Sequence, residues 1–335
     1  SIYGMGRHNH ENAVGIPGYG HPVVLSGDDT FDAPASQLYS YVAPSGEAVW
    51  NDTGDLYVFV SGNPAINDYG DLTLANSTFG QFVKVPKDIA TGKKDGREVT
   101  SLDYDDIPLP PAGIPDGPQW VLEYWSHNLV PGRAFQFIRV EDIAYDRNNP
   151  RVVYLADTGE PRAISDGAGR LRRGPSTAPD VPNGPYPNGR IFKLVLNPSD
   201  PLKVDSLSVL IDADALGYFN PGALHQPDNL ETTANSLLIQ EDPGGHQQSS
   251  ASGPRAGMTN ARVWRYTLPS GPLVPVAEVN QALRPASPRA IACVKRAKRQ
   301  CLISGGSLPP LAASLAMTCL CSQMFISALP SFAPV

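Results

Sequence analysis

The first stretch of the sequence that could do chemistry is GRHNHEN, residues 6–12, with one arginine, two histidines and one glutamate. Residues two apart lie on the same side of an extended chain, so His8 and His10 would share a face, as some metal sites require. A polar loop that only contacts water can have the same composition. These residues therefore leave open a metal ligand, a proton carrier and a solvated loop.

A cation and a carboxylate lie two residues apart in the apolar segment FQFIRVED, where Arg139 and Glu141 flank Val140. On an extended strand the two charged side chains would point the same way, together with Phe137, while Ile138 and Val140 would take the other face. Such charges are costly to bury unless they are paired or bound to a ligand. The spacing therefore predicts either a structural ion pair or a binding site.

Two further acidic segments adjoin apolar runs. Asp28 and Asp29 end the run VVLSGDD, and HQPDNLE, residues 225–231, precedes the run SLLIQED. Aspartate often caps turns by accepting hydrogen bonds from local backbone N–H groups, and Pro-Asp-Asn is a common turn tripeptide. Each segment alone is thus also compatible with an ordinary turn.

The elements that would position these residues are short strands. Runs rich in β-branched and aromatic residues recur between Gly, Pro, Asn and Asp, among them QLYSYVA, DLYVFVSG, GQFVKVP, RVVYLADTG, GRIFKLVLN and ARVWRYTL. The 31 glycines and 34 prolines interrupt the chain too often for long helices. This pattern predicts an all-β fold, either a β-propeller or a large sandwich. We favour the propeller, because its loops bring distant residues together, with the Pro/Gly-rich segments 106–118 and 174–189 as insertions between blades.

Four motifs occur in a fixed order: GRHNHE, VVLSGDD, FIRVED and PDNLE. In this order they resemble the PhoX-type alkaline phosphatases, which are secreted bacterial phosphomonoesterases, over about residues 1–268. The resemblance implies a six-bladed propeller, incomplete in this chain, with a cluster of calcium and iron in its channel. It also implies that carboxylates and one cysteine hold the metals and that an arginine binds phosphate.

The resemblance assigns roles to four residues of this chain. Glu11, Glu141 and Asp228 would be metal ligands, and Arg139 would be the catalytic, phosphate-binding residue. His10, Asp28 and Asp29 are expected near the site without an assigned role. Carboxylate oxygens suit calcium, and a planar guanidinium matches two phosphate oxygens. The cysteine of the family lies upstream of its first motif, where this chain has no counterpart, so no residue is assigned to iron.

The expected function is hydrolysis of small phosphate monoesters by a monomeric, secreted or periplasmic enzyme, although no signal peptide starts this chain. Two alternatives remain open: a non-catalytic calcium-binding propeller, and another propeller hydrolase such as a phytase or a lactonase. The net charge of −7 and the absence of a basic stripe with interleaved aromatics before residue 280 argue against nucleic acid as a partner.

The composition changes at about residue 281. Residues 281–335 contain no Asp or Glu and all four cysteines of the chain. Their segment CVKRAKRQC could be a basic interaction patch, and the longest apolar run is too short to span a bilayer. We expect one propeller domain over residues 1–280, and a tail that is poorly ordered or foreign to the domain.

Overall fold

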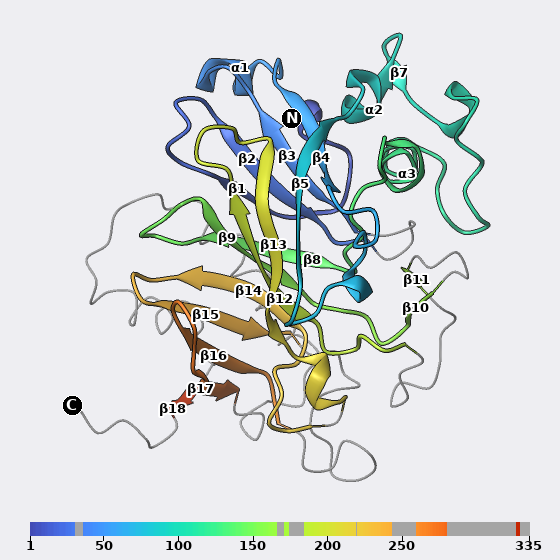
Figure 1. The fold of residues 1–335 in the computed structure, drawn as a ribbon. Coiled ribbons are helices and arrows are strands. Elements are labelled where there is room, and N and C mark those ends of the chain that lie inside the picture. Colours follow the sequence, from blue (N-terminus) through green and yellow to red (C-terminus); the bar gives the residue numbers. More distant parts are fainter. Residues whose placement is uncertain are drawn as a thin grey trace.

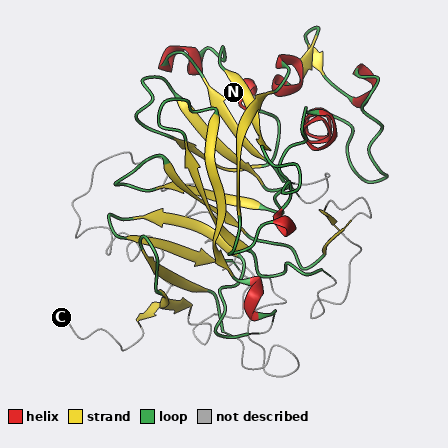
Figure 2. Ribbon diagram, viewed as in Figure 1, coloured by secondary structure: helices red, strands yellow, loops and turns green. Residues whose placement is uncertain are grey.

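The protein is described here by a computed structural model, which covers residues 1–30, 36–165, 171–173, 184–218, 220–242, 259–279 and 326–328. Strands dominate this part of the chain, and the helices are short (Figure 2). The predicted all-β class is therefore confirmed. Six separate blades are not visible among the described residues, and the six-bladed propeller stays a prediction.

Nine strands form one antiparallel sheet that covers the upper and middle parts of Figure 1. Their order in the sheet is β1 (His10–Gly15), β2 (Val23–Asp28), β3 (Leu38–Val42), β4 (Asp55–Ser61), β5 (Ser77–Lys84), β13 (Lys203–Asp212), β12 (Arg190–Leu196), β9 (Val152–Asp157) and β8 (Val140–Tyr145). The last strand, β8, packs against β1 and β2 at the other end. The sheet is thus nearly closed on itself.

A second antiparallel sheet lies below the first in Figure 1. It comprises β14 (Pro227–Thr232), β15 (Ser236–Glu241), β16 (Arg262–Thr267), β17 (Leu273–Val279) and β18 (Ile326–Ala328). Of the tail, the structure describes only β18, which pairs with β17. The four cysteines, and the predicted disorder or foreign origin of the tail, lie outside the described residues.

The remaining elements are small. Two hairpins are formed by β6 (Lys93–Lys94) with β7 (Arg97–Glu98), and by β10 (Ala163–Ser165) with β11 (Leu171–Arg173). The helices are α1 (Gly46–Trp50), α2 (Lys87–Thr91) and α3 (Pro118–Tyr124), with single turns η1 (Tyr3–Met5), η2 (Tyr69–Asp71), η3 (Ser101–Asp103), η4 (Trp125–Leu129) and η5 (Asp214–Leu216). Pro118 suits the first position of α3, where its missing N–H has no partner to lose. Residues 106–118 do lead from one element to another, whereas most of 174–189 lies outside the described residues.

Helix α3 covers one face of β3 and β4. Its apolar residues Trp120, Val121 and Leu122 pack in one buried cluster with Tyr39 and Leu56 of those strands. The same turn of helix also buries Glu123, which is fully inaccessible to solvent. A carboxylate is therefore held between the helix and the sheet.

Three runs of four strands repeat the same antiparallel meander: β1–β4, then β8, β9, β12 and β13, then β14–β17. Strand β5 pairs with both β4 and β13 and so joins the first two runs into one sheet. The first strands of the runs lie together, because β8 packs against both β1 and β14. Residues at the start of each run consequently meet near the middle of the molecule.

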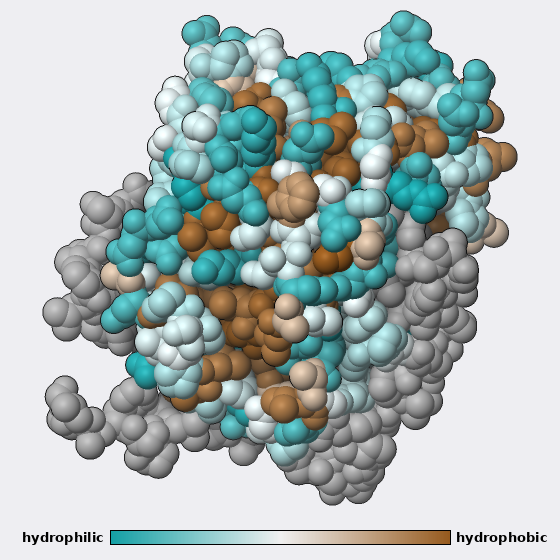
Figure 3. Space-filling model, viewed as in Figure 1, coloured by the Kyte–Doolittle hydropathy of each residue, from teal (hydrophilic) through white to brown (hydrophobic). Residues whose placement is uncertain are grey.

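Hydrophilic and hydrophobic residues are interspersed on the face drawn in Figure 3, as is usual for folded proteins. The most exposed large apolar side chains in the described ranges are Trp50 and Leu102, at 82% and 81%. No described helix has the length and apolar character needed to cross a membrane.

Candidate metal centre

Three acidic residues occupy the same position in the three meanders. Glu11, Glu141 and Asp228 are each the second residue of the first strand of their run. Each also lies where the pairing with the next strand slips in register. Such a β-bulge redirects a side chain out of the regular alternation of the strand, and bulges are frequent beside active sites. In each of the three meanders, a bulge near the start of the first strand thus positions one carboxylate.

Side-chain contacts fix the three first strands to one another. Asn12 on β1 donates from Nδ2 to the carbonyl of Ile143 on β8, at 3.3 Å. Asp142 on β8 accepts a hydrogen bond from the N–H of Leu230 on β14, at 2.7 Å. Because β8 is held on both sides, the three bulges lie close to one another.

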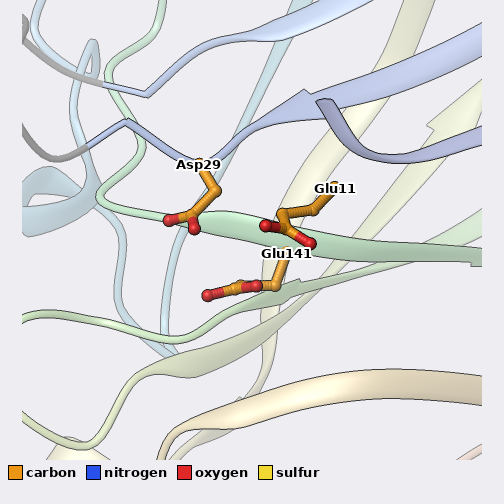
Figure 4. A group of neighbouring side chains, drawn as sticks. All are labelled: Glu11, Asp29 and Glu141. Carbon is orange, nitrogen blue, oxygen red and sulfur yellow. The ribbon is translucent and has the colours of Figure 1, made fainter. Parts of the chain in front are cut away.

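The carboxylates of Glu11, Asp29 and Glu141 converge (Figure 4), and each offers an oxygen within 4.8 Å of the other two. Asp29 directly follows β2, where its N–H donates to the carbonyl of Asn9 at 3.0 Å. Asp29 and Glu141 are buried, whereas Glu11 is exposed, so the cluster opens to solvent on the side of Glu11. Asp228 is not a member of this closest group, but its charge raises the pKa of Glu141.

The guanidinium of Arg139 lies on two of these carboxylates. Nε donates to Asp29 Oδ1 at 2.7 Å and Nη2 to Asp29 Oδ2 at 3.3 Å, and Nη2 also forms an ion pair with Glu141. Arg139 and Glu141 therefore form an ion pair, which is one of the two arrangements that their spacing predicts. Burial alone would lower the pKa of Arg139, but Glu141 and Asp29 outweigh it and raise that pKa.

One cation does not balance the acidic groups of the cluster. Burial raises the pKa of Glu141 to about 9, and the charges of Asp29, Asp228 and Glu11 act in the same direction against Arg139. Burial and the neighbouring carboxylates therefore favour the form of Glu141 that carries a proton, whereas Arg139 favours the ionised form. A divalent cation could take the place of that proton.

Asp157, the last residue of β9, holds the backbone that carries Arg139. Its buried carboxylate accepts hydrogen bonds from the N–H groups of Ile138 (2.8 Å), Arg139 (3.1 Å) and Gly159 (3.0 Å). Residues 137–139 precede β8 and do not continue its alternation. Phe137 packs in the same buried core cluster as Ile138. The expectation that Phe137 shares the face of Arg139 is therefore wrong.

Gly27 permits the close approach of β2 and β8. A Cβ at this position would lie 2.5 Å from the side chain and 2.5 Å from the carbonyl oxygen of Val140. Ser36 closes the same junction, since Val140 N donates to Ser36 Oγ at 3.1 Å and Ser36 Oγ donates to the carbonyl of Asp28. Glycine therefore lets Asp29 and Glu141 meet across two strands that are not hydrogen-bonded neighbours.

The histidines of residues 6–12 lie together but outside the carboxylate cluster. The rings of His8 and His10 have centroids 3.6 Å apart, and His8 stacks on Tyr39. Nε2 of His10 lies 3.2 Å from the carbonyl of Gly6. Burial lowers the pKa of both histidines, so the neutral forms are favoured.

The residues present fit a hard divalent cation. Three carboxylates offer up to six oxygens, which is the donor type that calcium prefers. No cysteine lies among the described residues, so iron coordination of the kind expected from the resemblance is not tested.

Sequence reasoning found Glu11, Asp29, Arg139 and Glu141 but missed the residues that hold them in place. Asp157 follows a β-rich run and precedes Thr-Gly, a signal that could have marked it. Glu123 offers a weaker signal, as a carboxylate within the apolar helix PQWVLEY. The role of Gly27 depends on β8 and has no local signal.

Comparison with known proteins found no family model, no curated protein and no solved structure that matches this chain. Its function therefore has to be inferred from the site itself.

Proposed function

We propose that this protein is a divalent-cation-dependent phosphomonoesterase whose substrate binds at Glu11, Asp29, Glu141 and Arg139. One observation carries the proposal: three carboxylates converge within 4.8 Å beside a guanidinium that bridges two of them. The order of the four sequence motifs, which resembles PhoX-type alkaline phosphatases, supports the same function. A secreted or periplasmic location belongs to this proposal.

Glu11, Asp29 and Glu141 would hold the cation, with Asp228 beside them. When bound, a hard divalent cation polarises a phosphoryl oxygen. Arg139 can orient the phosphate, because a guanidinium presents two parallel N–H donors to two oxygens. Its side chain is only 15% exposed, so little water competes with a phosphate bound to these donors.

The repeated meanders support a propeller. In our proposal the three runs are blades, with β1, β8 and β14 as the strands nearest the axis, and β5 joins the outer strands of two blades. The equivalent bulges at Glu11, Glu141 and Asp228 follow naturally, because corresponding positions of blades face the same axis.

A non-catalytic calcium-binding module is the second candidate, and one observation favours it. Arg139 is engaged with the same carboxylates that would hold the cation. If that pairing persists in the loaded protein, Nε and Nη2 are not available to phosphate. Such a module would be stabilised by Ca²⁺ without any turnover.

The decisive experiment measures hydrolysis of p-nitrophenyl phosphate at alkaline pH by the full chain, stripped with a chelator and then supplied with Ca²⁺. Phytate and a lactone as parallel substrates separate the other propeller hydrolases. We expect Ca²⁺-dependent turnover of the simple ester, which Glu141→Gln abolishes.

The matched control is Glu231→Gln on β14, whose carboxylate is exposed, forms an ion pair with Arg147 at the surface and accepts the N–H of Thr232. This variant should retain turnover. Stabilisation by Ca²⁺ with no hydrolysis of any of these substrates would identify the binding module and refute the enzyme.

A further inference from the structure

The side chains of two consecutive residues at the end of β2, Asp28 and Asp29, point to opposite faces of the strand. Asp29 meets Arg139 and Glu141, whereas the side chain of its neighbour Asp28 faces α3, where Glu123 is its nearest charged influence. This division follows from the alternation of side chains along an extended chain. Asp28 therefore belongs to a different environment from the candidate metal centre.

Asp28 has two structural equivalents that show what its position normally requires. The last residue of the second strand in each meander is acidic: Asp28 in β2, Asp157 in β9 and Glu241 in β15. Each pairs with the first residue of the preceding strand, namely His10, Val140 and Pro227. The three carboxylates are thus related by the internal repeat.

Two of these carboxylates are fully satisfied within the chain. Asp157 accepts three backbone N–H groups, as described above. Glu241 accepts the N–H of His225 at 2.9 Å, the N–H of Arg262 at 2.8 Å and Nε1 of Trp264 at 2.8 Å. Each of the two is a structural anchor for the segment before its first strand.

Asp28 differs from both. It is fully inaccessible to solvent, and neither of its carboxylate oxygens has a hydrogen-bond partner among the described residues. No Lys, Arg or His in the described ranges forms an ion pair with it. The backbone N–H of Asn9 is close enough to lower the pKa of Asp28, but it forms no hydrogen bond of normal geometry with either oxygen. A buried carboxylate without donors is strongly disfavoured unless something neutralises it.

The largest effect of a neighbouring charge on Asp28 comes from a second buried carboxylate. Glu123 faces Asp28 and is also fully buried, with Oε2 at 3.3 Å from Thr30 Oγ1 and Oε1 at 2.9 Å from Gln119 Nε2. Gln37 lies opposite Asp28 in the β2–β3 ladder, where the N–H of Asp28 donates to its carbonyl at 3.2 Å. Two buried carboxylates therefore face each other, and the Thr30 hydroxyl and the Gln119 amide donate to Glu123 and not to Asp28.

We propose that Asp28 and Glu123 bind a second divalent, oxygen-preferring cation between β2 and α3, separate from the centre at Glu11, Asp29 and Glu141. Both proposed ligands are carboxylates, which favours Ca²⁺ over metals that prefer nitrogen or sulfur. Because one ligand lies on the sheet and the other on the helix, the ion fixes α3 against the strand that carries Asp29. This inference does not depend on phosphatase activity.

The test counts Ca²⁺ ions bound by the full chain after chelator treatment, by isothermal titration and by elemental analysis. We expect two ions in the wild type, one in Asp28→Asn and in Glu123→Gln, and one in Glu141→Gln. The Asp28→Asn, Glu141→Gln double variant should bind none. Glu141→Gln thus tests the second site even if the first site proves not to be catalytic.

The competing account is that Asp28 and Glu123 merely share a proton. In that case Asp28→Asn leaves the number of bound ions unchanged and raises the melting temperature of the chelated protein, which would overturn the proposal. If Asp28→Asn does not fold, the wild type and Glu141→Gln still decide. Retention of one tightly bound ion by Glu141→Gln supports the second site, and loss of all bound Ca²⁺ in that variant refutes it.

Discussion

Replacement of Arg139 by lysine separates phosphate binding from metal binding. The guanidinium makes a two-pronged contact with Asp29, at 2.7 Å and 3.3 Å, and also pairs with Glu141. Lysine keeps the charge but has a single nitrogen, so it cannot present two parallel N–H donors. The substitution therefore changes geometry while it leaves the net charge of the site intact.

The expected magnitude follows from this loss. At least one buried, charge-assisted hydrogen bond disappears, which costs about 1.5–3 kcal/mol. In the metal-free protein this amount should be lost from the free energy of unfolding. If phosphate takes the same two donors, its affinity should fall by a similar amount, or roughly tenfold to a hundredfold. Affinity for Ca²⁺ should stay the same or rise, because lysine binds the carboxylates of Asp29 and Glu141 less tightly than arginine does.

The assay combines melting curves, with and without Ca²⁺, and inhibition or binding by inorganic phosphate. Arg190→Lys is the matched control, because Arg190 makes the same two-pronged contact with Asp212, at 3.1 Å and 3.2 Å, away from the site. This control should lose stability and keep its affinity for phosphate.

Two results would contradict this reasoning. Equal loss of stability in both variants with unchanged phosphate affinity would show that Arg139 is only a structural ion-pair partner. Loss of Ca²⁺ stabilisation in Arg139→Lys would show that the arginine supports the metal site and does not compete with it.

Three further predictions concern the fold around the site. Gly27→Ala should destabilise the protein by about 1–3 kcal/mol through overpacking and should weaken Ca²⁺ binding. Gly15→Ala should do neither, because a Cβ at this position meets nothing within 4 Å. Unfolding curves and Ca²⁺ titrations compare the two variants. Burial lowers the pKa of His225 to about 4, so the neutral form is favoured on folding and stability should fall by up to about 3 kcal/mol as pH drops from 6.5 towards 4. His225→Gln should flatten that pH dependence in denaturant titrations. A chain that ends at residue 280 should keep its melting temperature within a few degrees, and a large drop would show that the tail, including β18, completes the sheet.

Local features of the sequence determined the strand-rich class and part of the site. Runs of β-branched and aromatic residues between glycines and prolines favour strands wherever they lie, so the class could be predicted without partners. The sequence indicated that Arg139 and Glu141 would form either an ion pair or a binding site, and the two do form an ion pair, although Arg139 precedes β8. The same period explains why Asp28 and Asp29 serve opposite faces.

Tertiary structure alone decided which of these residues meet. Asp29 and Arg139 are 110 positions apart, and they pair because β8 packs against β1 and β2 without being their neighbour in the sheet. The join of β4 to β13 through β5 is equally long-range. A period-2 pattern tells which side chains share a face but not which distant strand lies beside them, since that is set by packing of the whole core.

The clearest difference concerns the buried acids at the ends of β2, β9 and β15. Both Asp28 and Asp157 end apolar strands, and the sequence around them does not tell which carboxylate meets hydrogen-bond donors in the fold. Only the folded chain brings three N–H groups to Asp157 and a second carboxylate, Glu123 of α3, to Asp28. The sequence alone therefore specified where carboxylates occur, and the packing of α3 and β8 determined which carboxylate is a structural anchor and which has no hydrogen-bond partner in the described part of the chain.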